Sequence, residues 1–448
     1  MKKAIALLLA LLIIVPLAAC SQQASPSAAT SEAPASESAA APASASQETA
    51  SESPAEDITL TMWTIATESD SHHEPYLKSI ADYEASHPGI KIQMETFENE
   101  SYKTKIKAAV AAKELPDIFF TWGGGFSTAF VQSGAVLPVD DVYAEYQNQL
   151  PKSMLGNLTW DDKIYGTGYT MNVSMLFYNK TMFAKYNLTP PTTYDELVNV
   201  CKTFIEKGIT PFGISAKDTW VLAQTHDQFT LKSVGSKTLQ SVLTKSGTGS
   251  YNSADFVTAS TDFANLVKMG AYSKNAVALS NDEACATFYS GEVPMYIMGS
   301  WMCGSILTDA PNPDDFGVVP VPVINSSNAA VTDFMGGPSD SLMVSSTSQY
   351  PKEAAEAMFE IAKGVSHYGY LAGCGLPAWA IDYDDSTVNP LTQEVAKYVA
   401  NATSFTLWFD TLMEAEDTAV YLENLQQLYL GDITPEDFCK AMSDQLGS

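Results

Sequence analysis

The sequence predicts an α/β fold, and two observations lead to this prediction. From residue 57 onward, segments with strand-like patterns alternate with segments of helical periodicity. The chain has 448 residues, of which 46% are hydrophobic and 10% are aromatic, so it can build one large or two medium cores. Alternation of this kind is typical of a parallel or mixed sheet covered by helices.

The first five expected elements follow one another closely. Residues 58–65 alternate in polarity and are rich in β-branched side chains, which predicts a strand. Residues 75–86 carry apolar side chains on one side of a helix, which His87-Pro88-Gly89 ends. The pattern then predicts a strand at 90–97, a helix at 102–113 and a third strand from 115–120.

The later elements repeat the theme. The helix expected at 194–207 has Thr192 or Thr193 as its N-cap, and Asp195 and Glu196 favour its first turn. The remaining expectations are strands at 175–178, 212–215 and 293–298, an edge-like segment at 318–323, helices within 230–270 and at 352–363, and helix throughout after Leu391.

The N-terminus predicts export and a lipid anchor. Lys2 and Lys3 precede a short apolar run, which is typical of a secretory signal peptide over residues 1–19. Leu17-Ala18-Ala19-Cys20 resembles the lipobox of bacterial lipoproteins, which implies lipidation of Cys20. Residues 20–56 are rich in Ser, Ala and Pro and hold too little apolar surface to fold, so we expect a disordered tether.

The charge balance limits the partners. The formal net charge is −28, and every basic residue is lysine because the sequence contains no arginine. An acidic surface does not suit nucleic acid or anionic lipid. Arginine is the preferred clamp for carboxylate and phosphate, so its absence weighs against an anionic ligand. Five cysteines remain besides Cys20, and no pair of them has metal-ligand spacing: Cys201, Cys285, Cys303, Cys374 and Cys439.

Several fragments, in order across residues 57–448, resemble the extracellular solute-binding proteins of ABC sugar importers. They are the strand ending in Trp63 with His87-Pro88-Gly89-Ile90, Glu114-Leu115-Pro116-Asp117 with Trp122, Gly166-Thr167-Gly168-Tyr169, Tyr194-Asp195-Glu196-Leu197, Phe288-Tyr289-Ser290-Gly291 with Gly299-Ser300-Trp301, and Gly375-Leu376-Pro377-Ala378.

The resemblance implies a periplasmic-binding-protein-like fold of two α/β lobes with a hinge and a ligand cleft between them. We expect an N-terminal lobe of residues 57–168 with 338–380 and a C-terminal lobe of 172–334 with 384–448. The chain would cross between them near 169–172, 334–338 and 380–385, and glycines at two of these crossings suit a hinge.

The implied function is capture of a sugar or oligosaccharide by lobe closure and delivery to the permease subunits of an ABC importer. The protein would act as a monomer on the outer face of the cytoplasmic membrane, anchored by lipid on Cys20, extracellular or periplasmic. No cofactor, metal or catalytic residue is implied.

Sugars offer apolar faces for aromatic stacking and a rim of hydroxyls for carboxylates and amides. In the family, aromatic residues at positions like Trp122, Trp220, Trp301 and Trp408 line the cleft. Together with residues near strand ends and crossings, this gives eleven candidates for ligand contact: Trp122, Trp301, Trp63, Trp220, Trp408, Trp379, Tyr169, Glu68, Asp218, Asn172 and Asp282.

Two other classes remain open. A cationic solute such as a polyamine suits the acidic balance, and it would require carboxylates rather than amides to dominate the cleft. A carbohydrate-active enzyme would require two carboxylates across a glycosidic bond, but the sequence holds none of the common hydrolase or nucleotide-binding motifs.

Overall fold

The structure is a computed structural model that describes residues 57–447. The predicted signal peptide (1–19), the lipidation of Cys20 and the tether (20–56) lie outside the described residues. Among residues 57–447, no helix is both long and apolar enough to cross a membrane. The described cysteines at 201, 285, 303, 374 and 439 are all buried and form no disulfide with one another.

The first sheet has five strands in the order β2-β1-β3-β12-β6. Its members are β1 (Ile58–Thr64), β2 (Ile90–Thr96), β3 (Ile118–Trp122), β6 (Gly166–Gly168) and β12 (Asp340–Val344). β1 runs parallel to both β2 and β3, whereas β12 runs antiparallel to β3 and β6. The early strand and helix predictions are therefore confirmed, with boundaries shifted by a few residues.

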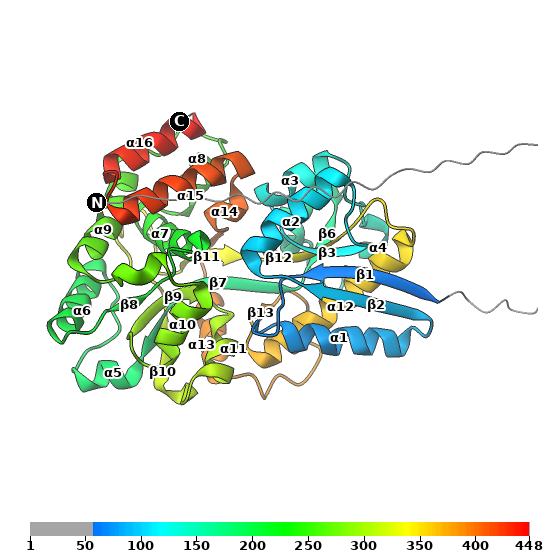
Figure 1. Ribbon diagram of the computed structural model, residues 1–448, viewed down its shortest axis with the longest axis horizontal. Coiled ribbons are helices and arrows are strands. Elements are labelled where there is room, and N and C mark those ends of the chain that lie inside the picture. Colours follow the sequence, from blue (N-terminus) through cyan, green and yellow to red (C-terminus); the bar gives the residue numbers. More distant parts are fainter. Residues whose placement is uncertain (1–56, 448) are drawn as a thin grey trace, which may run out of the picture. The chain divides into compact units, whose positions relative to one another are not determined.

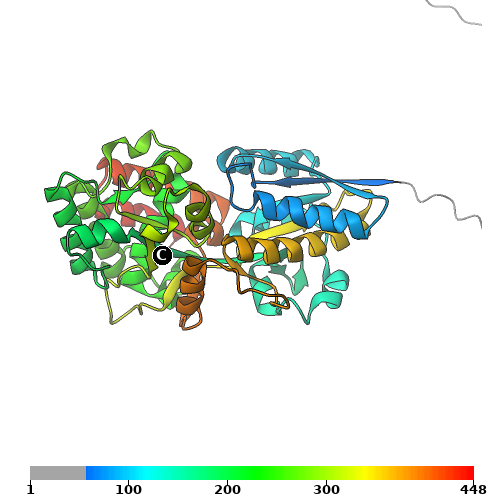
Figure 2. The same cartoon turned by 90° about the horizontal axis from the view of Figure 1, so that it is seen from below.

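Helices α1 (His73–Ser86) and α12 (Pro351–Ala372) lie side by side against this sheet, as Figures 1 and 2 both show. α12 extends well beyond the expected 352–363 and ends at Gly373, whose left-handed conformation closes the helix. The other elements associated with this sheet are α2 (Asn99–Ala112), α3 (Gly125–Gln132), α4 (Asp140–Tyr146), a 3-10 helix (Lys152–Leu158), β4 (Thr159–Trp160) and β5 (Lys163–Ile164).

The second sheet is built around the long strand β7 (Thr170–Asn179). Its order is β14-β11-β7-β9-β8, and β10 and β13 also pair with β7. The other strands are β8 (Phe212–Gly213), β9 (Met295–Gly299), β10 (Phe316–Val319), β11 (Asp333–Gly337), β13 (Leu376–Pro377) and β14 (Ser404–Thr406). Its surrounding helices are α5 (Lys180–Lys185), α6 (Tyr194–Glu206), α7 (Thr219–Val234), α8 (Ser236–Leu243), α9 (Ala254–Met269), α10 (Asn281–Tyr289), α11 (Met302–Asp309), α13 (Pro390–Val399), α14 (Phe409–Leu412), α15 (Ala415–Leu430) and α16 (Pro435–Leu446).

Thr193 is the N-cap of α6, which decides between the two candidates. Its hydroxyl accepts from the Glu196 backbone N–H at 3.3 Å, and the Glu196 side chain reaches back to the cap, which forms a capping box. The prediction of helix throughout after Leu391 is wrong, because residues 404–406 form β14. This segment pairs in parallel with β11, and Phe405 stacks on Phe334 with ring centroids 6.4 Å apart.

Each sheet has its own hydrophobic core. One cluster centres on β1, β3, β12 and α12, and the other on β7, β9, α7 and α15. The chain passes from one sheet to the other after β6, again between β11 and β12, and a third time between α12 and α13. At the second passage a Cβ on Gly336 would lie 2.1 Å from the Asn172 carbonyl oxygen, and its φ of 137° also requires glycine.

Candidate functional site

A cavity of about 660 Å³ is lined by residues that belong to both sheets. From the first sheet come the loop after β1 (residues 65–72), the start of α2 and Trp122 at the end of β3. From the second come the start of α7, helix α10 and the turn after β9. The first contribution lies beyond the carboxyl ends of parallel strands, where α/β sheets commonly bind ligands.

Three tryptophans form an aromatic cluster on the side of the second sheet. The ring centroids of Trp220 and Trp301 are 6.2 Å apart, and those of Trp301 and Trp408 are 5.8 Å apart. Gly299 allows this arrangement, since a Cβ there would lie 2.1 Å from the Trp301 ring. Trp408 is fixed by the hydrogen bond that its Nε1 donates to Ser174 Oγ at 2.8 Å.

Trp122 brings a fourth indole from the first sheet. Its ring meets Phe120 and Phe126 edge to face, with centroids 4.8 Å and 5.0 Å away. The Lys103 ammonium lies 5.3 Å from the Trp122 centroid, within cation–π range. The cavity therefore has flat aromatic surfaces from both sheets, which is a suitable lining for the apolar faces of a ring-shaped solute.

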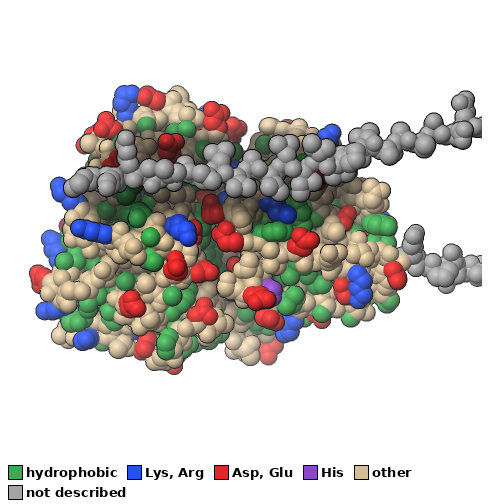
Figure 3. Space-filling model, in the orientation of Figure 1, with side chains coloured by type: hydrophobic (Ala, Val, Ile, Leu, Met, Phe, Trp, Pro, Cys, Tyr) green, Lys and Arg blue, Asp and Glu red, His purple; other side chains and the backbone are tan. Residues whose placement is uncertain are grey.

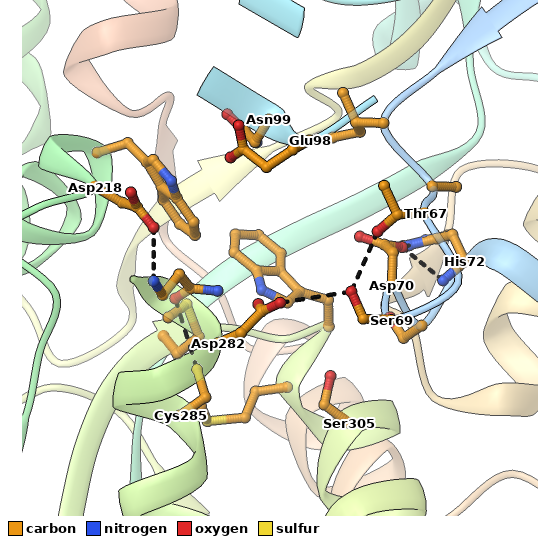
Figure 4. A pocket seen from close by; sticks show the side chains of 18 of the residues that line it. Thr67, Ser69, Asp70, His72, Glu98, Asn99, Asp218, Asp282, Cys285 and Ser305 are labelled. Atoms are coloured by element: carbon orange, nitrogen blue, oxygen red, sulfur yellow. Dashed lines mark hydrogen bonds and ion pairs between the residues drawn. The ribbon is translucent and has the colours of Figure 1, made fainter. Parts of the chain in front are cut away.

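Carboxylates line the same cavity, and Figure 4 shows four of them, Asp70, Glu98, Asp218 and Asp282. Asp218 Oδ2 accepts from the Asn281 backbone N–H at 2.6 Å, and burial raises the pKa of this carboxyl despite that bond. Burial also raises the pKa of Asp282, whose Oδ2 accepts from Ser69 Oγ at 3.5 Å. Ser69 follows β1 and Asp282 belongs to α10, so this contact joins the two halves of the cavity.

Asp340 and Asp410 also belong to the polar lining. Burial raises the pKa of Asp340 to about 6, although the Asn172 amide donates to its Oδ2 at 3.0 Å. Burial raises the pKa of Asp410 as well, and Lys103 Nζ lies 4.0 Å from its Oδ2. Like the Ser69–Asp282 and Asn172–Asp340 hydrogen bonds, the Lys103–Asp410 pair is a polar contact between residues associated with different sheets.

Seven of the eleven candidates from the sequence line this cavity: Trp122, Tyr169, Asp218, Trp220, Asp282, Trp301 and Trp408. Tyr169 is buried, with ring centroids 5.6 Å from both His72 and Tyr76. The structure thus brings together residues that lie far apart in the sequence, and the four tryptophans of the group share one space.

Four candidates do not line it. Trp63 packs against Phe97 with the Lys105 ammonium 4.2 Å from its ring, and Glu68 is exposed to solvent. Asn172 is fully buried, with its Oδ1 accepting from Ser300 Oγ at 2.7 Å.

Trp379 is the fourth candidate that does not line the cavity, and its side chain packs in the core. It is 4% exposed, its Nε1 donates to the Gly168 carbonyl at 2.9 Å, and it contacts Tyr146 and Phe359 edge to face. Its indole is therefore enclosed in the core of the first sheet.

Sequence reasoning missed most of the polar lining. The loop after β1 contributes Thr67, Ser69, Asp70 and His72, and the start of α2 contributes Glu98, Asn99 and Lys103. The loop after β1 could have been proposed from the sequence, because it follows the carboxyl end of a strand that is parallel to its neighbours, and ligands commonly bind at that end of such strands. Within residues 57–447, no group of three or more His, Cys, Asp or Glu side chains is arranged to hold a metal ion.

Comparison with known proteins gives a consistent result. Residues 69–362 match the model of the bacterial extracellular solute-binding protein family. An ABC transporter extracellular-binding protein of Pyrococcus horikoshii is 28% identical over 352 residues, which cover 77% of this chain and 79% of that protein. The melibiose/raffinose/stachyose-binding protein of Bacillus subtilis is 22% identical over 323 residues, covering 71% of this chain and 74% of that one.

Solved structures show the same fold. A protein from work on xylan utilization by the thermophilic bacterium Caldanaerobius polysaccharolyticus is 34% identical, with a TM-score of 0.83, and the match covers 87% of this chain and 100% of that chain. A chitin oligosaccharide binding protein superposes with a TM-score of 0.80 at 23% identity, covering 87% and 98% of the two chains. The predicted two-lobe architecture with α/β lobes is thereby confirmed.

Proposed function

Because the chain belongs to the family of bacterial extracellular solute-binding proteins, we propose that it captures a sugar or oligosaccharide and delivers it to the permease subunits of an ABC importer. The observation that carries the proposal is that four tryptophans and seven carboxylates line one cavity. A volume of about 660 Å³ is in the range of small-molecule sites. The relatives named for raffinose-type sugars and for chitin oligosaccharide support a carbohydrate ligand.

Capture proceeds by closure of two lobes. We assign residues 57–168 with 338–380 to one lobe and 172–334 with 384–448 to the other, with the hinge at the three crossings. The contacts of Ser69 with Asp282 and of Lys103 with Asp410 join residues of opposite lobes, so closure forms them together with the ligand contacts. The closed state gains population because only it engages the ligand from both sides.

The family acts outside the cytoplasm, and its members are binding proteins rather than enzymes. For this chain we propose the finer assignment of a lipoprotein that is anchored through Cys20 to the outer face of the cytoplasmic membrane, monomeric and without catalytic activity. Metabolic labelling with palmitate tests the anchor. The wild-type chain should take up label and remain with the membrane, and Cys20→Ser should lose both properties.

A second candidate follows from one observation. Carboxylates outnumber the three amide side chains of the lining, which are Asn99, Gln224 and Asn281. A solute with one or more ammonium groups, such as a polyamine, would pair with the carboxylates and stack its cationic groups over the tryptophans. Relatives named for sugars favour the carbohydrate, so the ammonium solute is the runner-up.

A thermal-shift screen tests both candidate functions. Mono- and oligosaccharides, polyamines and amino acids are added to the purified protein, and a ligand of the folded state raises Tm by mass action. We expect a carbohydrate class to do so and Trp301→Ala to abolish the shift. Trp160→Ala is the matched control, since Trp160 does not line this cavity and should leave the shift intact. Silence of every carbohydrate together with a shift by a polyamine would contradict the sugar assignment.

A further inference from the structure

The cavity carries a large excess of negative charge. Its lining holds one lysine, Lys103, and one histidine, His72. Against these stand seven carboxylates: Asp70, Glu98, Asp218, Asp282, Asp309, Asp340 and Asp410. On the face shown in Figure 3, acidic side chains also predominate over basic ones. The excess belongs to the site itself and is not only a property of the surface.

The single lysine is already engaged. Lys103 Nζ lies 2.8 Å from Glu100 Oε1 and 4.0 Å from Asp410 Oδ2, and it sits over the Trp122 ring. His72 is buried, and its Nδ1 lies 3.5 Å from Asp70 Oδ1. Neither side chain therefore offers an unpaired cation to an incoming ligand. The sequence supplies no arginine that could move into the site.

Two of the lining carboxylates, Asp218 and Asp340, are paired with neutral donors. The donor to Asp218 is the Asn281 backbone N–H, and the donor to Asp340 is the Asn172 amide, so their hydrogen bonds leave the negative charge in place. Asp70, Asp218, Asp340 and Asp410 are all partly buried, where solvent screens their fields less than at the surface. Figure 4 shows Asp70, Glu98, Asp218 and Asp282 arranged around a common space.

From these contacts, and resting on the proposed capture of carbohydrate, we infer that the cavity selects among sugars by charge. It takes neutral sugars, favours sugars that bear a free amino group, and rejects sugars that bear a carboxylate, such as uronates. A uronate would bring an anion among several partly buried carboxylates, with no free cation in the described lining to receive it. An ammonium group would be attracted by the same charges and by the faces of the tryptophans.

Isothermal titration calorimetry of the full-length chain tests this with matched ligands. The probes are cello-, xylo- and galacto-disaccharides and their counterparts in which one ring carries a carboxylate or an amino group. For the neutral scaffold that binds, we expect the uronate to bind at least tenfold more weakly than the neutral sugar, and the amino sugar to bind more tightly than it, at about 20 mM salt. Raising the salt concentration to about 300 mM should reduce both differences in affinity, because salt screens the charges.

The substitution Asp218→Asn separates the effect of the negative charge from the effect of the hydrogen bond at this position. It keeps an oxygen for the Asn281 N–H but removes one negative charge, so the ratio of uronate to neutral-sugar Kd should fall about threefold. Asp432→Asn is the control, because it removes an exposed carboxylate outside the cavity and should leave the ratio unchanged. A uronate that binds within threefold of its neutral counterpart would overturn selection by charge while leaving sugar capture intact. Failure of every carbohydrate to bind would overturn the proposed function, and the inference with it.

Discussion

Replacement of Tyr421 by phenylalanine tests how the core of the second sheet holds the cavity in place. The Tyr421 hydroxyl donates to Asp227 Oδ1 at 2.6 Å, and Asp227 Oδ2 accepts from the Phe409 backbone N–H at 3.0 Å. Phe409 lies between Trp408 and Asp410, which both line the cavity. One buried carboxylate on α7 thus ties α15 to the segment that presents two cavity residues.

The magnitude follows from burial. Tyr421, Asp227 and His226 are each 0% exposed, so water cannot replace a lost hydroxyl. Tyr421→Phe removes a donor from Asp227 and breaks the 3.0 Å hydrogen bond with His226 Nδ1, which retains only Thr230 Oγ1 at 3.5 Å. A stranded buried polar group costs about 1–3 kcal/mol, so we expect a loss of about 2–3 kcal/mol in the free energy of unfolding.

The loss should depend on pH. Burial raises the pKa of Asp227 well above its ordinary value, and the bond from Tyr421 opposes that rise. Without the hydroxyl the folded-state pKa rises further. The folded state then binds the proton more tightly than the unfolded state over a wider range, and stability falls more as pH increases. The penalty of Tyr421→Phe should therefore grow with pH once the pH exceeds the folded-state pKa of Asp227 in the wild type.

Urea denaturation followed by tryptophan fluorescence measures the effect. Tyr83→Phe is the matched control, because Tyr83 is 3% exposed and its hydroxyl has no hydrogen-bond partner among the described residues. It should change stability by less than about 0.5 kcal/mol. The reasoning is refuted if Tyr421→Phe costs no more than Tyr83→Phe, or if its cost does not grow with pH.

Three further substitutions have defined outcomes. The pKa of Asp340 is about 6 in the folded state and about 3.9 in the unfolded state, so the stability of the wild type should fall as the pH rises between these values. Asp340→Asn should remove this fall and raise the free energy of unfolding by about 1–2 kcal/mol at pH 7, after allowance for partial exposure. A pH profile of stability that Asp340→Asn leaves unchanged would contradict this prediction. Thr193→Ala should cost about 1 kcal/mol in urea denaturation through loss of the α6 cap, and Thr193→Ser should restore most of it. Lys232→Met should lower the free energy of unfolding by about 2–4 kcal/mol, because the Lys232 ammonium donates to three backbone carbonyls at 2.5–3.2 Å. A loss below about 1 kcal/mol would show that those carbonyls find other hydrogen-bond donors.

The tryptophans show how far sequence could lead toward the site. Trp63 is the second-last residue of β1 and Trp122 is the last of β3, and sequence reasoning gave both as candidates. In the sheet, however, Trp63 lies level with Phe119, three residues before Trp122. Trp122 therefore reaches the cavity, whereas Trp63 remains beside Phe97 and Lys105. The register between parallel strands, which decides this, depends on packing that no local pattern records.

The sequence by itself determined the alternation of strands and helices and the absence of arginine, and it predicts the export signal and the lipid anchor. These depend on local periodicity, composition and motifs, which act over a few residues. Only the tertiary structure decided which residues share the cavity, because Ser69 and Asp282 are brought together across 213 positions by sheet order and by the three passages of the chain. Composition could report that acidic residues are abundant, but folding decided that seven carboxylates would surround one cavity with a single, already paired lysine.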